Sequence, residues 1–189
     1  MKKLLLHSCC GPCSTSVIER LKKDYNITIF YYNPNIYPEA EYQKRLNTQK
    51  EYLKASHQDI KVIDGEYLDS SIFISEFIGL ENCKEGGKRC EKCIYLRIKK
   101  TAEYAKNNGY DLFASTLSVS PHKNANLINS IGLKCENEYD VKYLISDFKK
   151  QDGYLNSIKL SKQYNLYRQN YCGCKYSIWD KEYLNKITK

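Results

Sequence analysis

Cysteine is the residue type whose spacing in this chain most clearly indicates chemistry, with nine cysteines among 189 residues. Most of them fall into three tight pairs along the chain: Cys9-Cys10, Cys90-x-x-Cys93 and Cys172-Gly173-Cys174. Proteins of a reducing compartment rarely form structural disulfides, so a count this high favours metal binding or redox chemistry. Of the remaining three, Cys13 lies close to the first pair, whereas Cys83 and Cys135 stand apart and are expected to be incidental.

The first two pairs have the residue types and spacing of an iron–sulfur site. Cys90-x-x-Cys93 is a chelating pair, and Cys9-Cys10 is expected at a turn between a strand and a helix, where the helix start favours thiolates. Adjacent cysteines are unusual in structural zinc sites and suit a cluster lying across a loop. Two sulfurs from each segment provide the four thiolates that a [4Fe–4S] cluster requires. Cys13 is open to three interpretations: a ligand, a ligand of an extra metal, or a packing residue.

The third pair, Cys172 and Cys174, is too close in sequence for most shared chelation by one loop. Two cysteines separated by one glycine can close a strained disulfide, which is labile and therefore suited to catalysis. The preceding residues 167–171 combine one cation, two amides and two aromatic rings, a mixture that suits stacking and hydrogen bonding to a base. A redox role is favoured over an incidental pair in a surface loop.

Strand and helix patterns alternate along the chain. Strands are expected at residues 3–7, 27–32, 60–63 and 112–115. Helices are expected at residues 14–23 with Ser14 as the N-cap, and at 38–56, 94–108, 123–130, 151–164 and 177–186. This order predicts an α/β fold, a Rossmann-like parallel sheet flanked by helices, forming a single domain over residues 1–189.

The carboxyl ends of the expected strands place the polar segments of the chain together. Ligands of parallel sheets bind beyond these ends. Residues 8–13, 33–35 and 115–121 follow three of the strands, so we expect them to converge on one cleft. Residues 64–92 are the least regular and are interpreted as an insertion that delivers Cys90 and Cys93 to that cleft.

The charge and hydrophobicity of the chain indicate which kinds of partner it can bind. The net charge is +8, from 30 Lys+Arg against 22 Asp+Glu, which favours a polyanionic partner such as RNA or a phosphorylated substrate. A solvated lysine-rich surface explains the same charge equally well. No segment approaches the roughly 20 apolar residues of a membrane span, and the apolar run at residues 4–6 is too short for a signal peptide. A cytoplasmic protein with no membrane partner is expected.

Motifs spread in order over almost the whole chain resemble those of the QueH-type epoxyqueuosine reductases. The matching residues are His7-x-Cys9-Cys10-Gly11-Pro12-Cys13, Tyr32-Asn33-Pro34-Asn35-Ile36, Arg89-Cys90-x-x-Cys93-x-x-x-Arg97, Thr116-Leu117 with Ser120-Pro121-x-Lys123, Asp147-Phe148-Lys149-Lys150 and Tyr167-Arg168-Gln169-Asn170-Tyr171-Cys172-Gly173-Cys174. Any one of these motifs would be weak alone, but together they are specific.

The resemblance implies an oxidoreductase that removes the epoxide oxygen from epoxyqueuosine in tRNA, the last step of queuosine biosynthesis. It implies a fold like that of the adenine nucleotide alpha hydrolase group, a [4Fe–4S] cluster, a further mononuclear iron close by, and an electron donor that is not identified. Carried onto this chain, it implies that the cluster ligands are Cys9, Cys10, Cys90 and Cys93. Cys172 and Cys174 would then form the redox-active disulfide, and Cys13 is a candidate ligand of the second metal.

Three other functions remain as alternatives. The first is a zinc-stabilised RNA-binding module that uses Cys10, Cys13, Cys90 and Cys93 and has no redox activity. The second is a metal-free thiol–disulfide oxidoreductase, although such enzymes usually carry Cys-x-x-Cys. The third is an ATP-using tRNA thiolase or ligase, which needs a Ser-Gly-Gly-like loop after the first strand, where this chain has cysteines.

Overall fold

Five parallel strands form the centre of the computed structural model, which describes residues 1–65, 67, 73 and 75–177. Their order across the sheet is β3-β2-β1-β4-β5. The strands are β1 (Lys2–His7), β2 (Tyr25–Tyr31), β3 (Lys61–Asp64), β4 (Leu112–Ser115) and β5 (Lys142–Tyr143). The helices are α1 (Gly11–Leu21), α2 (Glu39–Ser56), α4 (Lys88–Asn107), α5 (Ala125–Tyr139) and α6 (Gly153–Gln163), with a short 3-10 turn η1 (Thr116–Val119). The predicted α/β architecture is confirmed.

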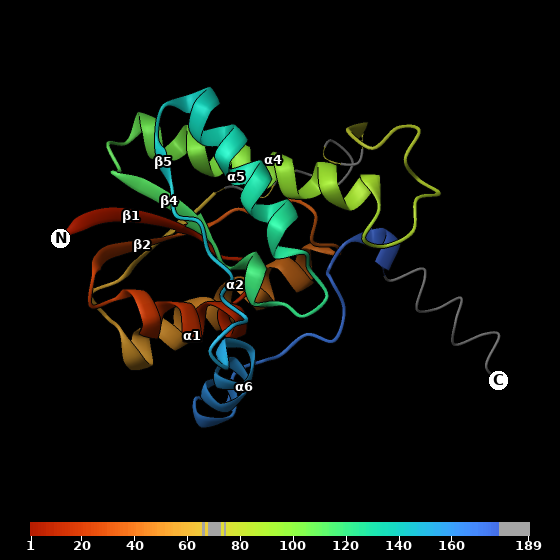
Figure 1. The fold of residues 1–189 in the computed structure, drawn as a ribbon. Coiled ribbons are helices and arrows are strands. Elements are labelled where there is room, and N and C mark those ends of the chain that lie inside the picture. The colour runs from red at the N-terminus through yellow and green to blue at the C-terminus, as the bar shows by residue number, and fades with distance from the viewer. Residues whose placement is uncertain (66, 68–72, 74, 178–189) are drawn as a thin grey trace, which may run out of the picture.

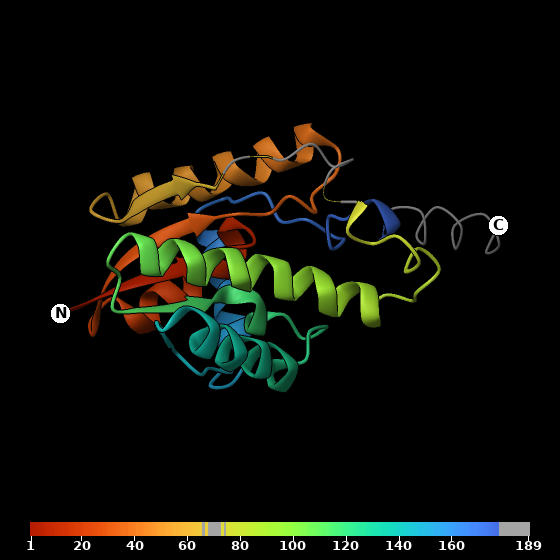
Figure 2. The same ribbon diagram turned by 90° about the horizontal axis from the view of Figure 1, so that it is seen from above.

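Helices cover both faces of the sheet, with α1, α2 and α6 on one side and α4 and α5 on the other (Figures 1 and 2). Leu4 and Leu6 pack with the α1 and α2 side, whereas Leu5 packs with the α4 and α5 side. All three leucines are completely buried, as expected of a central strand that is covered on both faces. Each contributes roughly 1.5–3 kcal/mol through burial, so β1 is a rigid base for the residues that follow it.

Helix α1 begins at Gly11 with Cys10 as its N-cap, so the expectation that Ser14 caps this helix was wrong. Pro12 lies in the first turn, where its missing N–H leaves no helical hydrogen bond unmade. Ser14 lies inside the helix, and its Oγ donates to the carbonyl of Gly11 at 2.8 Å. The earlier start brings Cys10 and Cys13 onto the first turn.

Helix α4 begins at Lys88, six residues before the expected start at residue 94. Arg89 is buried in this first turn and donates to the carbonyls of Leu80 and Glu81 at 3.2 and 2.7 Å. These bonds fix the preceding loop to the helix. Cys90 and Cys93 therefore lie on the helix rather than ahead of it.

Helix α5 continues to Tyr139, well beyond the expected end at residue 130. Gly132, normally a weak helix former, is required because a Cβ there would collide with the ring of Tyr143. Strand β5, which carries Tyr143, has only two residues and was not predicted. The helix expected at residues 177–186 lies outside the described residues except for its first position. In the part of the chain that is described, no helix is both long and apolar enough to cross a bilayer.

Candidate metal and redox site

Three segments meet at the carboxyl edge of the sheet, as the sequence predicted. Asn33, which follows β2, donates from Nδ2 to the carbonyl of Ser8 at 2.8 Å. The backbone N–H of Cys9 donates to Oγ1 of Thr116, which follows β4, at 3.3 Å. The turn that carries the first cysteine pair is therefore held from both neighbouring strands.

Cys9, Cys10 and Cys13 form the first cysteine group, in which all three sulfur atoms lie within 4.8 Å of one another. The sulfurs of Cys9 and Cys10 are 3.8 Å apart. Cys10 is completely buried, whereas Cys9 and Cys13 are partly exposed. Because thiolates are strong ligands for iron and zinc, this group can hold a metal ion.

The sulfurs of this group differ in their affinity for a proton. Hydrogen bonds from the Cys10 and Cys13 thiols keep the pKa of Cys9 well below that of an ordinary cysteine, although burial opposes this. The Thr116 hydroxyl also donates to Cys9 Sγ, at 3.7 Å. The pKa of Cys13 is raised well above its ordinary value by its hydrogen bonds to the sulfurs of Cys10 and Cys9 and by burial. A metal ion would displace the remaining protons, because a metal binds the thiolate form.

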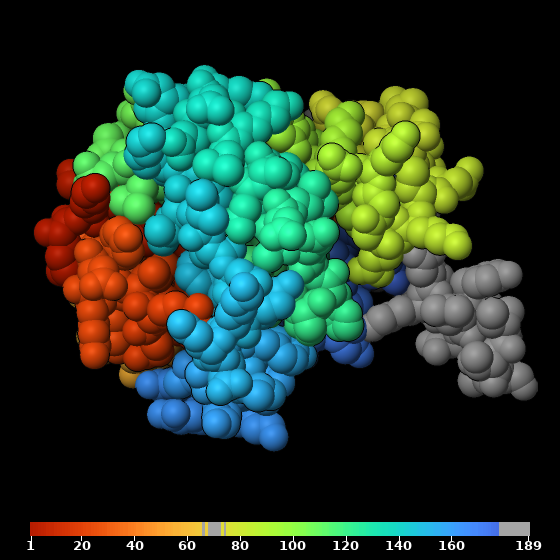
Figure 3. Space-filling model, viewed as in Figure 1, coloured from red at the N-terminus to blue at the C-terminus, as the bar shows by residue number. Residues whose placement is uncertain are grey.

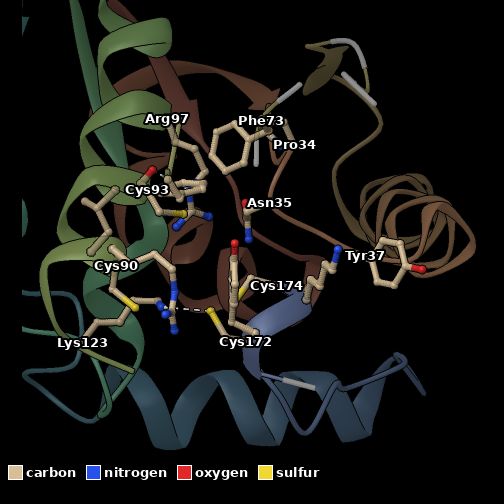
Figure 4. Close-up of a pocket in the computed structure, with 15 residues that line it drawn as sticks. Pro34, Asn35, Tyr37, Phe73, Cys90, Cys93, Arg97, Lys123, Cys172 and Cys174 are labelled. Atoms are coloured by element: carbon tan, nitrogen blue, oxygen red, sulfur yellow. Dashed lines mark hydrogen bonds between the residues drawn. The ribbon is translucent and has the colours of Figure 1, made fainter. Parts of the chain in front are cut away.

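Cys90, Cys93 and Arg97 occupy one face of α4, since they are three and four residues apart. They line a narrow cavity of about 40 Å³ that Cys172 and Cys174 also line (Figure 4). The second and third cysteine pairs of the sequence are thus brought to one space. In the space-filling view, the segment that precedes α4 lies beside the segment near residue 120, with the C-terminal segment visible between them (Figure 3).

A second, wide cavity of about 630 Å³ adjoins the narrow one. Cys9 and Cys13 of the first cysteine group line it. The two cavities share three lining residues, Arg97, Lys123 and Cys172. These three side chains therefore separate the narrow cavity from the wide one. A substitution of Cys172 would alter the lining of both cavities.

Lys123 is the charged partner of Cys172. Its Nζ donates to Cys172 Sγ at 3.7 Å, the contact drawn as a dashed line in Figure 4. A hydrogen bond from the Cys174 thiol, together with the charges of Lys123 and Arg97, holds the pKa of Cys172 well below its usual range. The Cys172 thiolate in turn raises the pKa of Lys123. A thiolate beside a thiol is the arrangement that thiol–disulfide exchange requires. Cys172 and Cys174 are not joined by a disulfide in this structure.

Arg97 is a buried cation at the centre of the site, only 3% exposed. Its guanidinium donates to the carbonyl of Cys93 at 3.4 Å and to Oδ1 of Asn33 at 3.3 Å. Among the described residues, neither Arg97 nor Lys123 has a carboxylate partner at ion-pair distance. Burying an unpaired charge is costly, so the cysteine sulfurs must supply the opposing charge. The site is therefore suited to a thiolate-held group of net negative charge.

Arg45 holds the loop that carries Cys172 and Cys174. It is 2% exposed, pairs with Glu41 at 2.7 Å, and donates from Nη1 to the carbonyl of Cys172 at 3.1 Å. The carbonyl of Gly173 accepts from the backbone N–H of Tyr37 at 2.8 Å. Gly173 has a φ of +107°, and a Cβ there would lie 2.8 Å from Arg45 Nη1. Glycine is required here for two reasons: it adopts this positive φ without strain, and it has no Cβ to collide with the guanidinium.

His7, at the end of β1, is a packed and neutral residue. Its Nε2 lies 3.1 Å from the carbonyl of Tyr32, so this nitrogen carries the proton, and Nδ1 accepts from Ser115 Oγ at 2.9 Å. Burial, reinforced by the charge of Arg97, lowers the pKa of His7 to about 4. His7 therefore orders the site and holds no charge near neutral pH.

The four predicted ligands do not line one common cavity, and the buried Cys10 lines neither of the two. Cys9 and Cys10 belong to the first cysteine group, whereas Cys90 and Cys93 line the narrow cavity, so the set of four ligands stays a prediction. Sequence reasoning gave no role to Arg45, Arg97 or Lys123. The spacing of Arg97 from Cys93 and the motif Ser120-Pro121-x-Lys123 were usable signals, but nothing local marks Arg45. Cys83 and Cys135 line neither cavity, and Cys135 is buried in the core.

Comparison with known proteins agrees with the residues of this site. The family model described as "Epoxyqueuosine reductase QueH" matches residues 4–180. A protein of that name from Staphylococcus epidermidis is 43% identical over 177 residues, covering 91% of this chain and 74% of the relative. One from Thermotoga maritima is 36% identical over 183 residues, covering 96% of this chain and 93% of the relative. One from Streptococcus pyogenes is 39% identical over 178 residues, covering 92% of this chain and 69% of the relative. The matched residues 4–180 contain all three cysteine pairs, both cavities and the two cations that line both of them. The chain with this cysteine-lined site therefore belongs to the QueH family of epoxyqueuosine reductases and is an oxidoreductase of queuosine biosynthesis.

Proposed function

We propose that this enzyme removes the epoxide oxygen from epoxyqueuosine within tRNA, using an iron–sulfur centre and a cysteine dithiol. Cys9, Cys10, Cys90 and Cys93 are the proposed cluster ligands, with Cys13 available to a second iron. The observation that carries the proposal is the shared wall between the two cavities. There Cys172 borders both the cysteine-lined narrow cavity and the wide cavity that reaches Cys9 and Cys13.

The donor set fits an iron–sulfur group. Cys9 lines the wide cavity, Cys90 and Cys93 line the narrow one, and the sulfur of Cys10 lies 3.8 Å from that of Cys9. Together they offer the four thiolates that a [4Fe–4S] cluster needs. Its negative charge would be balanced by Arg97 and Lys123, which lack carboxylate partners among the described residues. Such a group, when bound, supplies one-electron transfer and, at an iron with an open position, a Lewis acid for the epoxide oxygen.

Cys172 and Cys174 supply the reducing equivalents. Converting an epoxide to an alkene breaks two C–O bonds, consumes two electrons and two protons, and releases water. Closing a disulfide from two thiols delivers the same two electrons and two protons as the S–S bond forms, so the step balances. Lys123 borders both cavities, and its ammonium group can deliver a proton to the leaving oxygen. A cellular thiol or electron carrier then reopens the disulfide.

The charge and shape of the enzyme favour tRNA as the form of the substrate. A net charge of +8 attracts the phosphates of an anticodon stem-loop. Arg168, His122 and Tyr171 line the wide cavity and offer cationic and stacking contacts to a nucleotide that has left the base stack. Because tRNA is modified in the cytoplasm, we place the enzyme there.

Anaerobic purification and reconstitution, followed by an absorption spectrum and by iron and sulfide analysis, tests the metal part of the proposal. The expected result is a brown protein with about four iron and four sulfide per cluster. A colourless protein that holds only zinc after reconstitution would contradict the cluster and favour the zinc-stabilised alternative.

A further inference from the structure

Gln169 connects the first cysteine group to the wide cavity. Its Nε2 lies 3.0 Å from the sulfur of Cys10. The residue also lines the wide cavity, together with Cys9 and Cys13. Its Oε1 is buried and has no hydrogen-bond partner among the described residues. The Gln169 amide thus donates from Nε2 to a cysteine sulfur, while its acceptor Oε1 makes no hydrogen bond.

The orientation of this amide follows from the chemistry of its neighbours. A metal-bound cysteine sulfur accepts hydrogen bonds and has no proton to donate, so the NH₂ group of Gln169 must face Cys10. The opposite orientation would direct an oxygen at that sulfur and would leave two buried N–H donors without partners. The Oε1 atom is therefore the end that is left without a partner.

We propose that the wide cavity binds the nucleoside and that Gln169 bridges it to the metal centre. The Oε1 atom accepts a hydrogen bond from an N–H or O–H of the nucleoside, while Nε2 donates to the Cys10 sulfur. The inference rests on the proposed function, because it assigns a place and a contact to that substrate. It makes Gln169 a residue of substrate recognition as well as a positioning residue for the metal.

The dimensions of the two cavities support this assignment. Small-molecule sites usually have volumes of roughly 300–1,000 Å³, a range that includes the wide cavity at about 630 Å³ and excludes the narrow one at about 40 Å³. Tyr154, Tyr171 and Arg168 line the wide cavity and are residue types on which bases stack. A buried acceptor without a partner is unfavourable, and a donor on the ligand removes that cost.

The bridge has a consequence for the metal centre as well as for binding. Hydrogen bonds to the sulfur ligands stabilise the reduced, more negative form of an iron–sulfur centre and raise its reduction potential. Losing the N–H donor of Gln169 should therefore shift the potential to a more negative value. A residue that only filled space would not change it.

Replacing Gln169 by leucine in the reconstituted holoenzyme removes both ends of the bridge while nearly preserving the volume of the side chain. Dissociation constants are measured for a tRNA that carries epoxyqueuosine and for the same tRNA without the modification. We expect Gln169→Leu to reduce the preference for the modified tRNA by roughly 2- to 10-fold, the effect of one hydrogen bond. A spectroelectrochemical titration should show a more negative potential. Gln163→Leu, at the exposed end of α6, is the matched control and should change neither quantity.

Gln169→Glu separates the two ends, because it keeps acceptor oxygens and loses the N–H donors. The expected result is a more negative potential with the preference for modified tRNA retained. A wild-type preference in Gln169→Leu, or a wild-type potential in Gln169→Glu, would overturn the bridge. If the wild-type enzyme does not convert epoxyqueuosine in tRNA to queuosine, the proposed function fails and the inference fails with it. If it does so but binds the two tRNAs equally, the inference alone fails.

Discussion

Gly173→Ala tests whether the geometry of the loop that carries Cys172 and Cys174 is essential. The added Cβ would lie 2.8 Å from Arg45 Nη1 and 3.2 Å from Arg45 Cζ. The guanidinium cannot withdraw freely, because it is held by Glu41 at 2.7 Å and by the carbonyl of Cys172 at 3.1 Å. Either the loop or the Arg45 contacts must therefore give way.

Two costs determine the size of the effect. Backbone strain for alanine at a φ of +107° is about 1–3 kcal/mol. Displacing the buried guanidinium from its acceptors costs about 1–3 kcal/mol more. Together they amount to about 2–6 kcal/mol against the native loop. The lower figure alone shifts the equilibrium towards a detached loop by about 30-fold. The loop can open locally, so the loss of global stability will be smaller than this sum.

The rate at which a small alkylating reagent modifies Cys172 in the reduced protein measures this opening, with turnover measured in parallel. Gly173→Ala should react much faster at Cys172 and should lose most of its turnover. Gly109→Ala is the matched control, since Gly109 has a φ of +66° with open space around its Cβ position, so that it carries backbone strain alone. Wild-type alkylation and turnover in Gly173→Ala would refute the conclusion that Arg45 and the backbone together require glycine here.

Further substitutions test the roles of the cysteines and of Lys123. Cys10→Ala and Cys90→Ala should each abolish cluster assembly, whereas Cys83→Ala should retain full iron content; full iron in either of the first two would remove that residue from the ligand set. Cys172→Ser should keep the iron and lose turnover, because a hydroxyl cannot form a disulfide, and wild-type turnover would exclude an essential disulfide. Lys123→Met should raise the pKa of Cys172 and shift the pH profile of its alkylation to higher pH, because one of the cations that stabilise the thiolate is gone. Lys123→Arg should preserve the profile, and an unchanged profile in Lys123→Met would show that this charge does not control Cys172.

The order of strands and helices was predictable because the spacing of hydrophobic residues and the runs of β-branched residues in the sequence follow from which residues are buried. The run Leu4, Leu5, Leu6 indicated a strand covered on both faces, and it is one. Helix boundaries were predicted less well, because they depend on contacts distant in sequence. Helix α4 begins earlier than expected because Arg89, in its first turn, binds carbonyls of the preceding loop. Helix α5 contains Gly132 because a Cβ there would collide with the ring of Tyr143.

The site was predictable at the level of cysteine pairs and of the edge of the sheet where they meet. What could not be predicted is how the pairs are connected. Arg45 lies in an ordinary helical pattern, and its role depends on a loop 127 residues away in sequence. Lys123 was visible only as part of a motif. Its role appears once η1 and the C-terminal segment are folded together, since Lys123 Nζ then reaches Cys172 Sγ.

The central claim is that the reduction draws its two electrons from Cys172 and Cys174. A single-turnover experiment tests it: the reconstituted enzyme is reduced, freed of reductant under anaerobic conditions and mixed with an excess of epoxyqueuosine tRNA. We predict that queuosine forms in proportion to the enzyme and that each molecule formed is matched by the loss of two thiols, mapped by mass spectrometry to a Cys172–Cys174 disulfide. Queuosine formed while both thiols remain reduced would contradict the account.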